Sequence, residues 1–269
     1  MPRAPETAPV AEPAPALEPA QEWLGGRLRL HHAARGAHRA GTDAVLLAAA
    51  AGAPEGLVYD LGAGTGAVGL AVAQASPACR VVLVERDPAA AALARANAAL
   101  NGLADRAAVL EADVTAPGAV RRAQGLMPDG ADLVLTNPPF FEGGGHRPSP
   151  VAARASAHAL PEGGLEAWLR TCADLLRPRG RLVLIHRADA LPACLAALRG
   201  RFGGLAVRPV HARAEAAAIR VLIEGVRGSR AAFALRPALV LHGPDGRFTP
   251  QAEALHRGAA MLYTNGPGC

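Results

Sequence analysis

The sequence contains no lysine, so all 28 of its basic residues are arginine. This absence excludes the P-loop lysine, a Schiff-base lysine and the catalytic lysine of kinases. Aromatic residues are also scarce, at 3% of a chain that is 51% hydrophobic. The core must therefore be built from alanine, leucine and valine. No apolar run reaches the roughly 18 residues of a membrane-spanning helix, and we expect no membrane partner.

Cysteine is the next residue in short supply. The four cysteines lie far apart and none belongs to a C-x-x-C pair, which argues against a zinc site or a disulfide framework and is typical of a reducing cytoplasm. No histidine pairs with a cysteine or an acid at metal-ligand spacing, so we predict no metal. Residues 1–21 lack the apolar stretch of a signal peptide, and their Pro/Ala/Glu composition predicts disorder.

Short β-rich segments alternate with helical segments from residue 57 onward. The predicted strands are 57–61, 80–85, 107–113, 131–137 and 181–186, and the predicted helices are 66–75, 88–102 and 165–178. This alternation predicts a parallel sheet. Two further strands, 205–210 and 219–225, have little helix between them and predict an antiparallel pair at one edge. Residues 41–51 predict an earlier helix, with Thr42 or Asp43 as its N-cap.

A glycine-rich segment stands at the first predicted strand-to-helix junction. In DLGAGTGAVG, residues 60–69, Asp60 is followed by Gly62, Gly64 and Gly66. Glycine permits a tight turn and a close approach of the backbone to a ligand, which side chains would prevent. Residues 64–69 also fit G-x-G-x-x-G, so a nicotinamide dinucleotide fold is a competing interpretation at this point.

Two acids stand at the ends of the next two predicted strands. Glu85 follows Asp60 by about 25 residues, the register in which an acid accepts hydrogen bonds from both ribose hydroxyls. Asp113 would lie beside an adenine and accept a hydrogen bond from its amino group. Both candidate folds use an acid like Glu85, so this acid indicates a nucleoside ligand without choosing between them.

The segment TNPPFF, residues 136–141, directly follows the fourth predicted strand. Pro138 and Pro139 have fixed φ angles and no N–H groups, so the turn presents carbonyl acceptors. The Asn137 side chain and the Pro138 carbonyl can together hold both protons of a planar amino group, which draws the nitrogen lone pair towards a methyl sulfonium. Phe140 offers a ring face on which the base can stack. A dehydrogenase has no use for this device.

The motifs DLGAGTG, LVERD, EAD and TNPPFF, in this order and at these spacings, resemble those of class I methyltransferases that modify amino nitrogens. Residues 25–49 and 147–158 resemble the bacterial tRNA adenine N6-methyltransferase family, which acts beside the anticodon of valine tRNA. The similarity covers roughly residues 23–257. It implies an α/β, Rossmann-like fold whose seven-stranded, mostly parallel sheet has helices on both faces and an antiparallel edge hairpin.

The resemblance also implies roles for individual residues. S-adenosylmethionine would lie at the carboxyl ends of the strands, bound by Thr42 and Asp43 at its methionine end, by the turn residues Asp60, Gly62, Gly64 and Gly66, by Glu85 at its ribose and by Asp113 at its adenine. The target amine and base would be held by Asn137, Pro138, Pro139 and Phe140. The expected regions are a disordered leader at 1–21, a basic segment and helix at 22–56, the methyltransferase domain at 57–257 and a flexible tail at 258–269.

A cluster of arginines precedes the first predicted helix. Arg27, Arg29, Arg35 and Arg39 lie within thirteen residues that contain no acid. The chain as a whole carries a net charge of +5 and has a pI near 9.6, which favours a polyanionic partner. We therefore predict an RNA-binding surface here, outside the cofactor pocket, with tRNA as the expected partner and no obligate protein partner.

The leading hypothesis is S-adenosylmethionine-dependent N6-methylation of an adenine in RNA, with tRNA beside the anticodon as the expected target. The first alternatives keep the chemistry but place it on a glutamine amide of a protein release factor, or on an amino group in rRNA or DNA. The release-factor family usually has tyrosine after Asn-Pro-Pro, so Phe140 favours a nucleobase. A non-catalytic RNA-binding module and a nicotinamide oxidoreductase are the alternatives from other classes, and the intact TNPPF segment argues against both.

Overall fold

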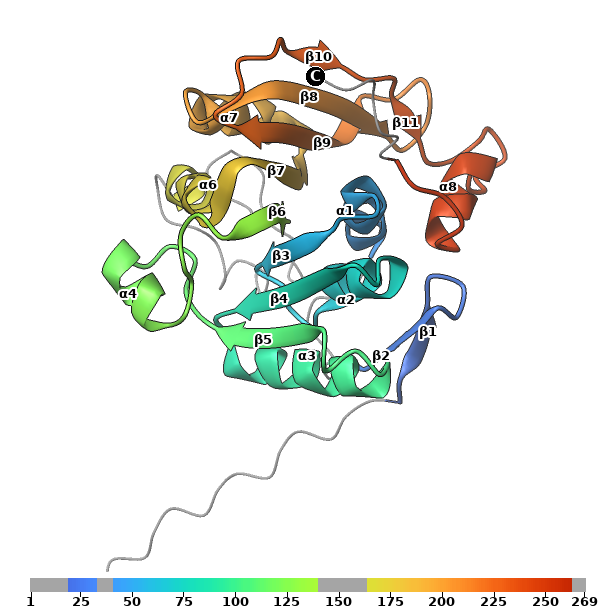
Figure 1. Cartoon of the computed structure of the whole chain (residues 1–269). Helices are drawn as coiled ribbons and strands as arrows, with labels where there is room; N and C mark the ends of the chain where they lie inside the picture. The colour runs from blue at the N-terminus through green and yellow to red at the C-terminus, as the bar shows by residue number, and fades with distance from the viewer. Residues whose placement is uncertain (1–18, 33–40, 140–163, 263–269) are drawn as a thin grey trace, which may run out of the picture.

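The computed structural model describes residues 19–32, 41–139 and 164–262. Within these residues the centre of the molecule is a sheet of nine strands (Figure 1). The seven longer strands are β3 (Gly56–Leu61), β4 (Cys79–Glu85), β5 (Ala107–Glu111), β6 (Ala131–Thr136), β7 (Leu176–Arg187), β8 (Phe202–His211) and β9 (Ala218–Arg227). Their order across the sheet is β8-β9-β7-β6-β3-β4-β5.

The strands from β3 to β7 pair in parallel, whereas β9 runs antiparallel to both of its neighbours, β7 and β8. The predicted antiparallel pair at the edge is confirmed, and β9 is its inner strand. Two short strands that the sequence did not predict, β10 (Ala234–Leu235) and β11 (Leu239–Val240), pair with β8 and extend this edge. The predicted seven-stranded, mostly parallel sheet therefore forms the centre of a slightly wider one.

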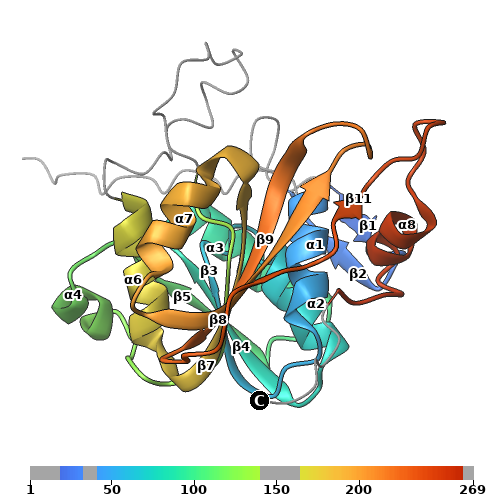
Figure 2. The ribbon, with the colours of Figure 1, turned by 90° about the horizontal axis from the view of Figure 1, so that it is seen from above.

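Helices cover both faces of the sheet, as predicted (Figure 2). One face carries α1 (Thr42–Ala51), α2 (Ala67–Ala75) and α3 (Pro88–Leu100), and the other carries α6 (Gly164–Leu175) and α7 (Leu191–Leu198). Three smaller elements complete the described fold: α4 (Gly118–Ala123), a 3-10 turn at Ala188–Ala190 and α8 (Pro250–His256), which packs beside α1.

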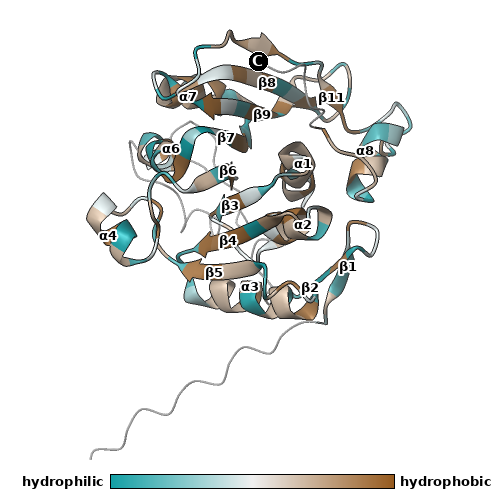
Figure 3. Ribbon diagram, in the orientation of Figure 1, coloured by the Kyte–Doolittle hydropathy of each residue, from teal (hydrophilic) through white to brown (hydrophobic). Residues whose placement is uncertain are grey.

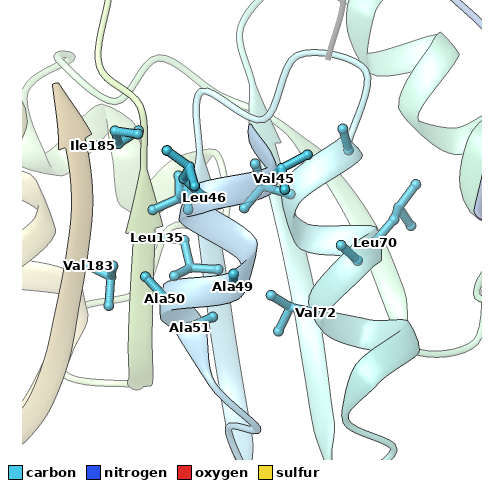
Figure 4. Packing of buried hydrophobic residues seen from close by; sticks show 14 of the residues in the cluster. Val45, Leu46, Ala49, Ala50, Ala51, Leu70, Val72, Leu135, Val183 and Ile185 are labelled. Atoms are coloured by element: carbon cyan, nitrogen blue, oxygen red, sulfur yellow. The ribbon is translucent and has the colours of Figure 1, made fainter. Parts of the chain in front are cut away.

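Successive strand residues point into two separate apolar layers, because side chains of a strand alternate between its faces. In β6, Leu133 and Leu135 pack on the α1 side, while Val134 packs on the α6 side. Figure 4 shows Val45 of α1 on the side of α2 and Leu46 on the side of Leu135 and Ile185 of the sheet. The buried apolar residues are mostly alanine, leucine and valine, as the composition predicted, and hydrophobic segments concentrate in the central strands and α1 (Figure 3).

Two predicted helix ends are corrected by the structure. The N-cap of α1 is Gly41, and Thr42 is already the first helical residue. The helix predicted to reach residue 178 ends at Leu175, and β7 begins at once, with a register irregularity against β6. The start of α3 agrees with its sequence signal, because Asp87 accepts hydrogen bonds from two backbone N–H groups and Pro88 occupies the first turn.

A short hairpin of β1 (Gln21–Trp23) and β2 (Leu28–Leu30) precedes α1 and packs against α3. Leu28 and Leu30 are buried in the α1-side layer. Of residues 1–21, which the sequence predicts to be disordered, positions 1–18 lie outside the described residues. Residues 19–21 are described, and Gln21 begins β1. In the described segments, no helix combines the length and apolarity needed to cross a membrane.

Candidate active site at the carboxyl edge of the sheet

The predicted site residues follow the carboxyl ends of four neighbouring parallel strands. Gly62 follows β3, Glu85 ends β4, Asp113 follows β5 and Asn137 follows β6. The chain order reverses at β3, which has β4 on one side and β6 on the other. A crevice outside such a switch point is where open parallel sheets bind ligands. The fold therefore brings these four segments to one edge, as the sequence predicted.

The glycine turn after β3 uses backbone conformations that favour glycine. The φ angles of Gly62, Gly64 and Gly66 are 74°, 55° and 87°, a region in which other residues are strained. The backbone N–H groups of Gly62 and Ala63 donate to the carbonyl of Val84, which ties the turn to the end of β4. A Cβ at Gly64 would meet no described atom within 4 Å. The turn thus leaves open space at its middle glycine, where a ligand can lie directly against the backbone.

Asp60 lies beneath this turn, with only 2% of its surface exposed. Its Oδ2 accepts a hydrogen bond of 2.8 Å from the backbone N–H of Gly69 in α2. Burial raises the pKa of Asp60 to about 7, the Gly69 bond opposes this rise, and the charge of Glu85 adds to it. Asp60 thus holds the first turns of α2 against β3, and its predicted place in the cofactor turn stays a prediction.

Glu85 connects the end of β4 to the glycine turn. Its Oε2 accepts a hydrogen bond of 2.8 Å from the N–H of Gly64, and its Oε1 accepts from the N–H groups of Arg86 and Asp87. These bonds fix the carboxylate at the rim of the turn. Each carboxylate oxygen has two acceptor positions, so Oε2 keeps capacity for a ligand hydroxyl.

Asp113 lies in a turn after β5. Its Oδ1 accepts hydrogen bonds from both the backbone N–H and the hydroxyl of Thr115, at 2.8 and 2.7 Å. These two bonds fix the rotamer of the carboxylate. Among the described residues no hydrogen bond involves its Oδ2, so this oxygen stays available as an acceptor.

The Asn137 turn begins at a fully buried threonine. The hydroxyl of Thr136 donates to the carbonyl of Leu61 at 2.9 Å and accepts from the indole N–H of Trp168 at 2.9 Å. Leu61 and Thr136 are also register partners of β3 and β6. The glycine turn and the Asn137 turn therefore start side by side. Asn137 and Pro139 are partly exposed, Pro138 is buried, and Phe140 lies outside the described residues.

Thr42 and Asp43 lie at the same edge of the sheet, because α1 runs antiparallel to the parallel strands. Arg181, early in β7, contacts the carbonyls of Ala50 and Ala51 at the end of α1. At its start, the Oδ2 of Asp43 accepts a 2.8 Å bond from Arg220 on β9. The Thr42 hydroxyl lies 3.4 Å from Nε2 of His256. Thr42 and Asp43 thus both lie at the carboxyl edge of the sheet, and each contacts another protein side chain.

Two residues important to this geometry were missed by sequence reasoning. Trp168 is one of two tryptophans and could have been singled out by rarity alone. Asn97 is fully buried in α3. Its side-chain N–H group donates to the carbonyls of His31 and of Thr65 in the glycine turn, and its Oδ1 accepts from the N–H of His31. A polar residue on the apolar face of a predicted helix was the available signal.

Only two of the four predicted RNA-binding arginines belong to the described residues. Arg27 and Arg29 are exposed on the β1–β2 hairpin, and Arg35 and Arg39 lie outside the described residues. The segment 27–39 holds no acid, but Glu22 of β1 is the register partner of Arg29. The local charge is therefore less positive than the segment alone indicates.

A cavity of about 160 Å³ lies between the hairpin, α1, α2 and α8. Its walls include the C-terminal parts of α1 and α2, which are directed away from the site edge. Of the predicted site residues, only Arg27 lines it. This cavity is therefore separate from the candidate active site.

The sheet order, the glycine turn after β3 and the acid that ends β4 define a Rossmann-like class I methyltransferase. A solved structure from Agrobacterium tumefaciens, described as a predicted O-methyltransferase, is similar to this fold. Its TM-score is 0.70, its sequence is 33% identical, and the match covers 83% of this chain and 99% of that one. The family model of the methyltransferase small domain matches residues 37–207. The chain belongs to this family of S-adenosylmethionine-dependent enzymes.

Similar curated proteins include tRNA methyltransferases and a release factor methyltransferase. A tRNA1(Val) (adenine(37)-N6)-methyltransferase of Porphyromonas gingivalis is 39% identical over 58% of this chain and 61% of its own length. One of the same name from Aeromonas hydrophila is 33% identical over 80% of this chain and 87% of its own length. A release factor glutamine methyltransferase of Mycolicibacterium smegmatis is 42% identical over 49% of this chain and 46% of its own length. The match to the Porphyromonas enzyme thus spans less than two thirds of that relative.

Proposed function

We propose that this protein transfers the methyl group of S-adenosylmethionine to N6 of an adenine in tRNA, beside the anticodon. The observation that carries the proposal is the adjacency of two turns. The glycine turn and the Asn137-Pro138-Pro139 turn leave neighbouring strands at one edge and are joined through the hydroxyl of Thr136. The relative of this activity that is aligned over 87% of its length supports the same substrate.

The residues at the edge fit the proposed methyl donor. The part of the ligand that lies against the backbone occupies the open space at Gly64. Glu85 accepts hydrogen bonds from the ribose hydroxyls, and Oδ2 of Asp113 accepts one from the adenine amino group. Thr42 and Asp43 line the methionine end. The sulfonium of S-adenosylmethionine supplies an activated methyl group when bound, so the proposal needs no metal.

The Asn137 turn would hold the acceptor. The side-chain carbonyl of Asn137 and the backbone carbonyl of Pro138 accept the two N–H protons of the adenine amine, and Phe140 stacks on the base. A carbon–nitrogen bond forms as the carbon–sulfur bond breaks, and the methylated amine then releases one proton to water. No strong general base is needed, because the amine becomes acidic as the new bond forms.

The substrate is proposed to be held by arginines outside the cofactor pocket. Arg27, Arg29, Arg35 and Arg39 would contact tRNA phosphates, which position the RNA without reading its sequence. A tRNA substrate places the enzyme in the cytoplasm, and no obligate protein partner is required.

One observation supports a second candidate substrate, the glutamine amide of a release factor. The release-factor relative is 42% identical, although over only 46% of its length, and a glutamine amide presents the same planar amino group as adenine. Phe140 in place of the tyrosine usual in that family favours the nucleobase.

Labelled S-adenosylmethionine, offered with tRNA and separately with release factor, tests the proposal. We expect transfer to tRNA, with the label recovered as N6-methyladenine. Asn137→Ala should lower turnover by about 10²–10³-fold, the effect of deleting one preorganised polar group, while calorimetry shows cofactor affinity nearly unchanged. Gln251→Ala, which removes an exposed side-chain amide on α8, is the control and should retain turnover. Label on release factor alone, or Asn137→Ala turnover within about twofold of wild type, would reject the assignment.

A further inference from the structure

Helix α6 follows the Asn137 turn in the sequence and packs beneath the candidate site. We propose that Trp168 and Thr171 of α6 are positioning residues, which set the distance between the methyl donor and its acceptor by holding three site loops in register. The inference rests on the proposed function, because the three loops are those assigned there to the cofactor and the target amine.

The first contact joins Trp168 to the Asn137 turn. The indole N–H of Trp168 donates to the Oγ1 of Thr136 at 2.9 Å, and this hydroxyl donates in turn to the carbonyl of Leu61 at 2.9 Å. Thr136 is fully buried and Trp168 is 5% exposed, so water cannot replace either bond. The relay connects the residue before Asn137 to the residue before Gly62.

The second contact joins the same indole to the glycine turn. A Cβ at Gly62 would lie 3.1 Å from Cζ2 and 3.2 Å from Cη2 of Trp168. The ring edge therefore occupies the space that a side chain at Gly62 would need. One tryptophan thus supports both turns, by a hydrogen bond to one and by direct packing against the other.

The third contact joins α6 to the loop of Asp113. Thr171 lies one helical turn after Trp168, on the same face of α6, and is fully buried. Its hydroxyl donates to the carbonyl of Val114 at 2.8 Å. Because Val114 follows Asp113 directly, the same helix face also fixes the loop that would receive the cofactor adenine.

A misplacement of about 1 Å between reacting groups can cost about a hundredfold in rate. At the carboxyl ends of β3 and β6, the relay is the only hydrogen-bonded path from α6 among the described residues. Its loss should therefore reduce kcat more than it weakens either ligand. A residue that only fills the core would lower stability and leave kcat unchanged below the melting temperature.

The first test uses variants that remove the relay: Thr136→Val keeps the side-chain volume, whereas Trp168→Phe also removes the ring edge that lies against Gly62. Thr136→Val and Trp168→Phe should each lower kcat for tRNA methylation by roughly ten- to hundredfold, with tRNA KM changed less than threefold. Thr136→Ser retains the hydroxyl and should restore most of the rate. The double variant should be no slower than the worse single variant, since either change breaks the same relay.

The second test needs no RNA. The chain has two tryptophans, so a Trp23→Phe background leaves Trp168 as the sole indole. Saturating S-adenosylmethionine should change the emission of Trp168, because the ring edge lies against the turn that receives the ligand. Adding Thr136→Val should shift the emission of the free protein and reduce the ligand-induced change.

The outcomes separate this inference from the proposed substrate. If wild-type protein binds S-adenosylmethionine but methylates no tRNA, the proposed function fails, while the emission experiment still tests Trp168. Relay variants with wild-type kcat and a lowered melting temperature would overturn the inference. The inference would also be overturned if calorimetry confirmed that S-adenosylmethionine binds and the emission of Trp168 nevertheless stayed unchanged. A Thr136→Ser variant as slow as Thr136→Val would overturn it as well.

Discussion

Asp60 illustrates how a single buried acid connects sequence, stability and the site. Its carboxylate is held in the interior by one hydrogen bond from Gly69 and lies close enough to Glu85 for their charges to interact. The same Gly69 allows α2 to approach the sheet, because a Cβ there would lie 2.3 Å from a methyl group of Leu83. Ionisation of Asp60 is opposed by burial, which dominates the rise of its pKa to about 7.

This pKa predicts a specific pH dependence of stability. A carboxyl with a raised folded-state pKa stabilises the fold fully below its unfolded pKa of about 3.9 and loses that contribution as pH rises through about 7. We expect the free energy of unfolding of wild type, relative to Asp60→Asn, to fall over this window by at most about 1.4 kcal/mol per pH unit. The Asn amide oxygen can still accept from Gly69.

Urea unfolding from pH 4 to pH 8 measures the difference between the two proteins. Asp105→Asn removes an exposed aspartate and is the matched control, which should follow wild type throughout. Parallel pH profiles for wild type and Asp60→Asn would show that Asp60 does not titrate in this window.

At the scale of elements, the β1–β2 hairpin is attached to α3 by two asparagine side chains one turn apart. Asn101 exchanges hydrogen bonds with the backbone of Arg29, as a neighbouring strand would, and Asn97 does the same with His31. Only Asn97 also donates to the carbonyl of Thr65 in the glycine turn. The hairpin and the glycine turn therefore share one buried amide.

This difference makes the two asparagines a matched pair for mutation. Asn97→Ala removes three hydrogen bonds to partly buried backbone groups and should lower the free energy of unfolding by about 1–3 kcal/mol. It should also weaken S-adenosylmethionine binding, because the Thr65 carbonyl loses its donor and the turn becomes less ordered. Asn101→Ala should affect stability less and leave cofactor affinity unchanged. Calorimetry of both variants decides this, and equal cofactor affinities would contradict the coupling.

At the scale of the whole molecule, the question is which surface holds a bulky RNA. Arg27 and Arg29 are exposed on the hairpin, and β2 runs from them towards His31, whose partner Asn97 reaches the glycine turn. The next residues of the chain carry Arg35 and Arg39. The described part of the proposed RNA surface is on the hairpin, which Asn97 connects to the glycine turn.

Replacing Arg27, Arg29 and Arg35 together with alanine should weaken tRNA binding and leave S-adenosylmethionine affinity unchanged. Each lost phosphate contact should flatten the slope of log affinity against log salt by somewhat under one unit. Filter binding across a salt series measures this slope. Alanine at Arg80, Arg199 and Arg230, which are exposed on other parts of the molecule, is the control. The same slope in the hairpin variant and in wild type would place the RNA elsewhere.

The sequence by itself determined the local chemistry of the site and most of the central sheet. The glycine turn and the Asn-Pro-Pro turn could be predicted because positive φ angles and proline rings act on their own residues and their immediate neighbours. The alternation of strands and helices determined which segments end at the same edge. Elements with weak local patterns were missed, among them the three-residue strands of the hairpin and the eight-residue α7.

Only the tertiary structure decided how the turns are held relative to one another. The bond from Trp168 to Thr136 spans 32 positions and that from His31 to Asn97 spans 66. The order in which β9 lies between β7 and β8 is likewise a property of the whole sheet. The physical reason is that such contacts form where packed elements bring distant residues within hydrogen-bond range. No local propensity encodes that distance, because it depends on how α3 and α6 settle against the completed sheet.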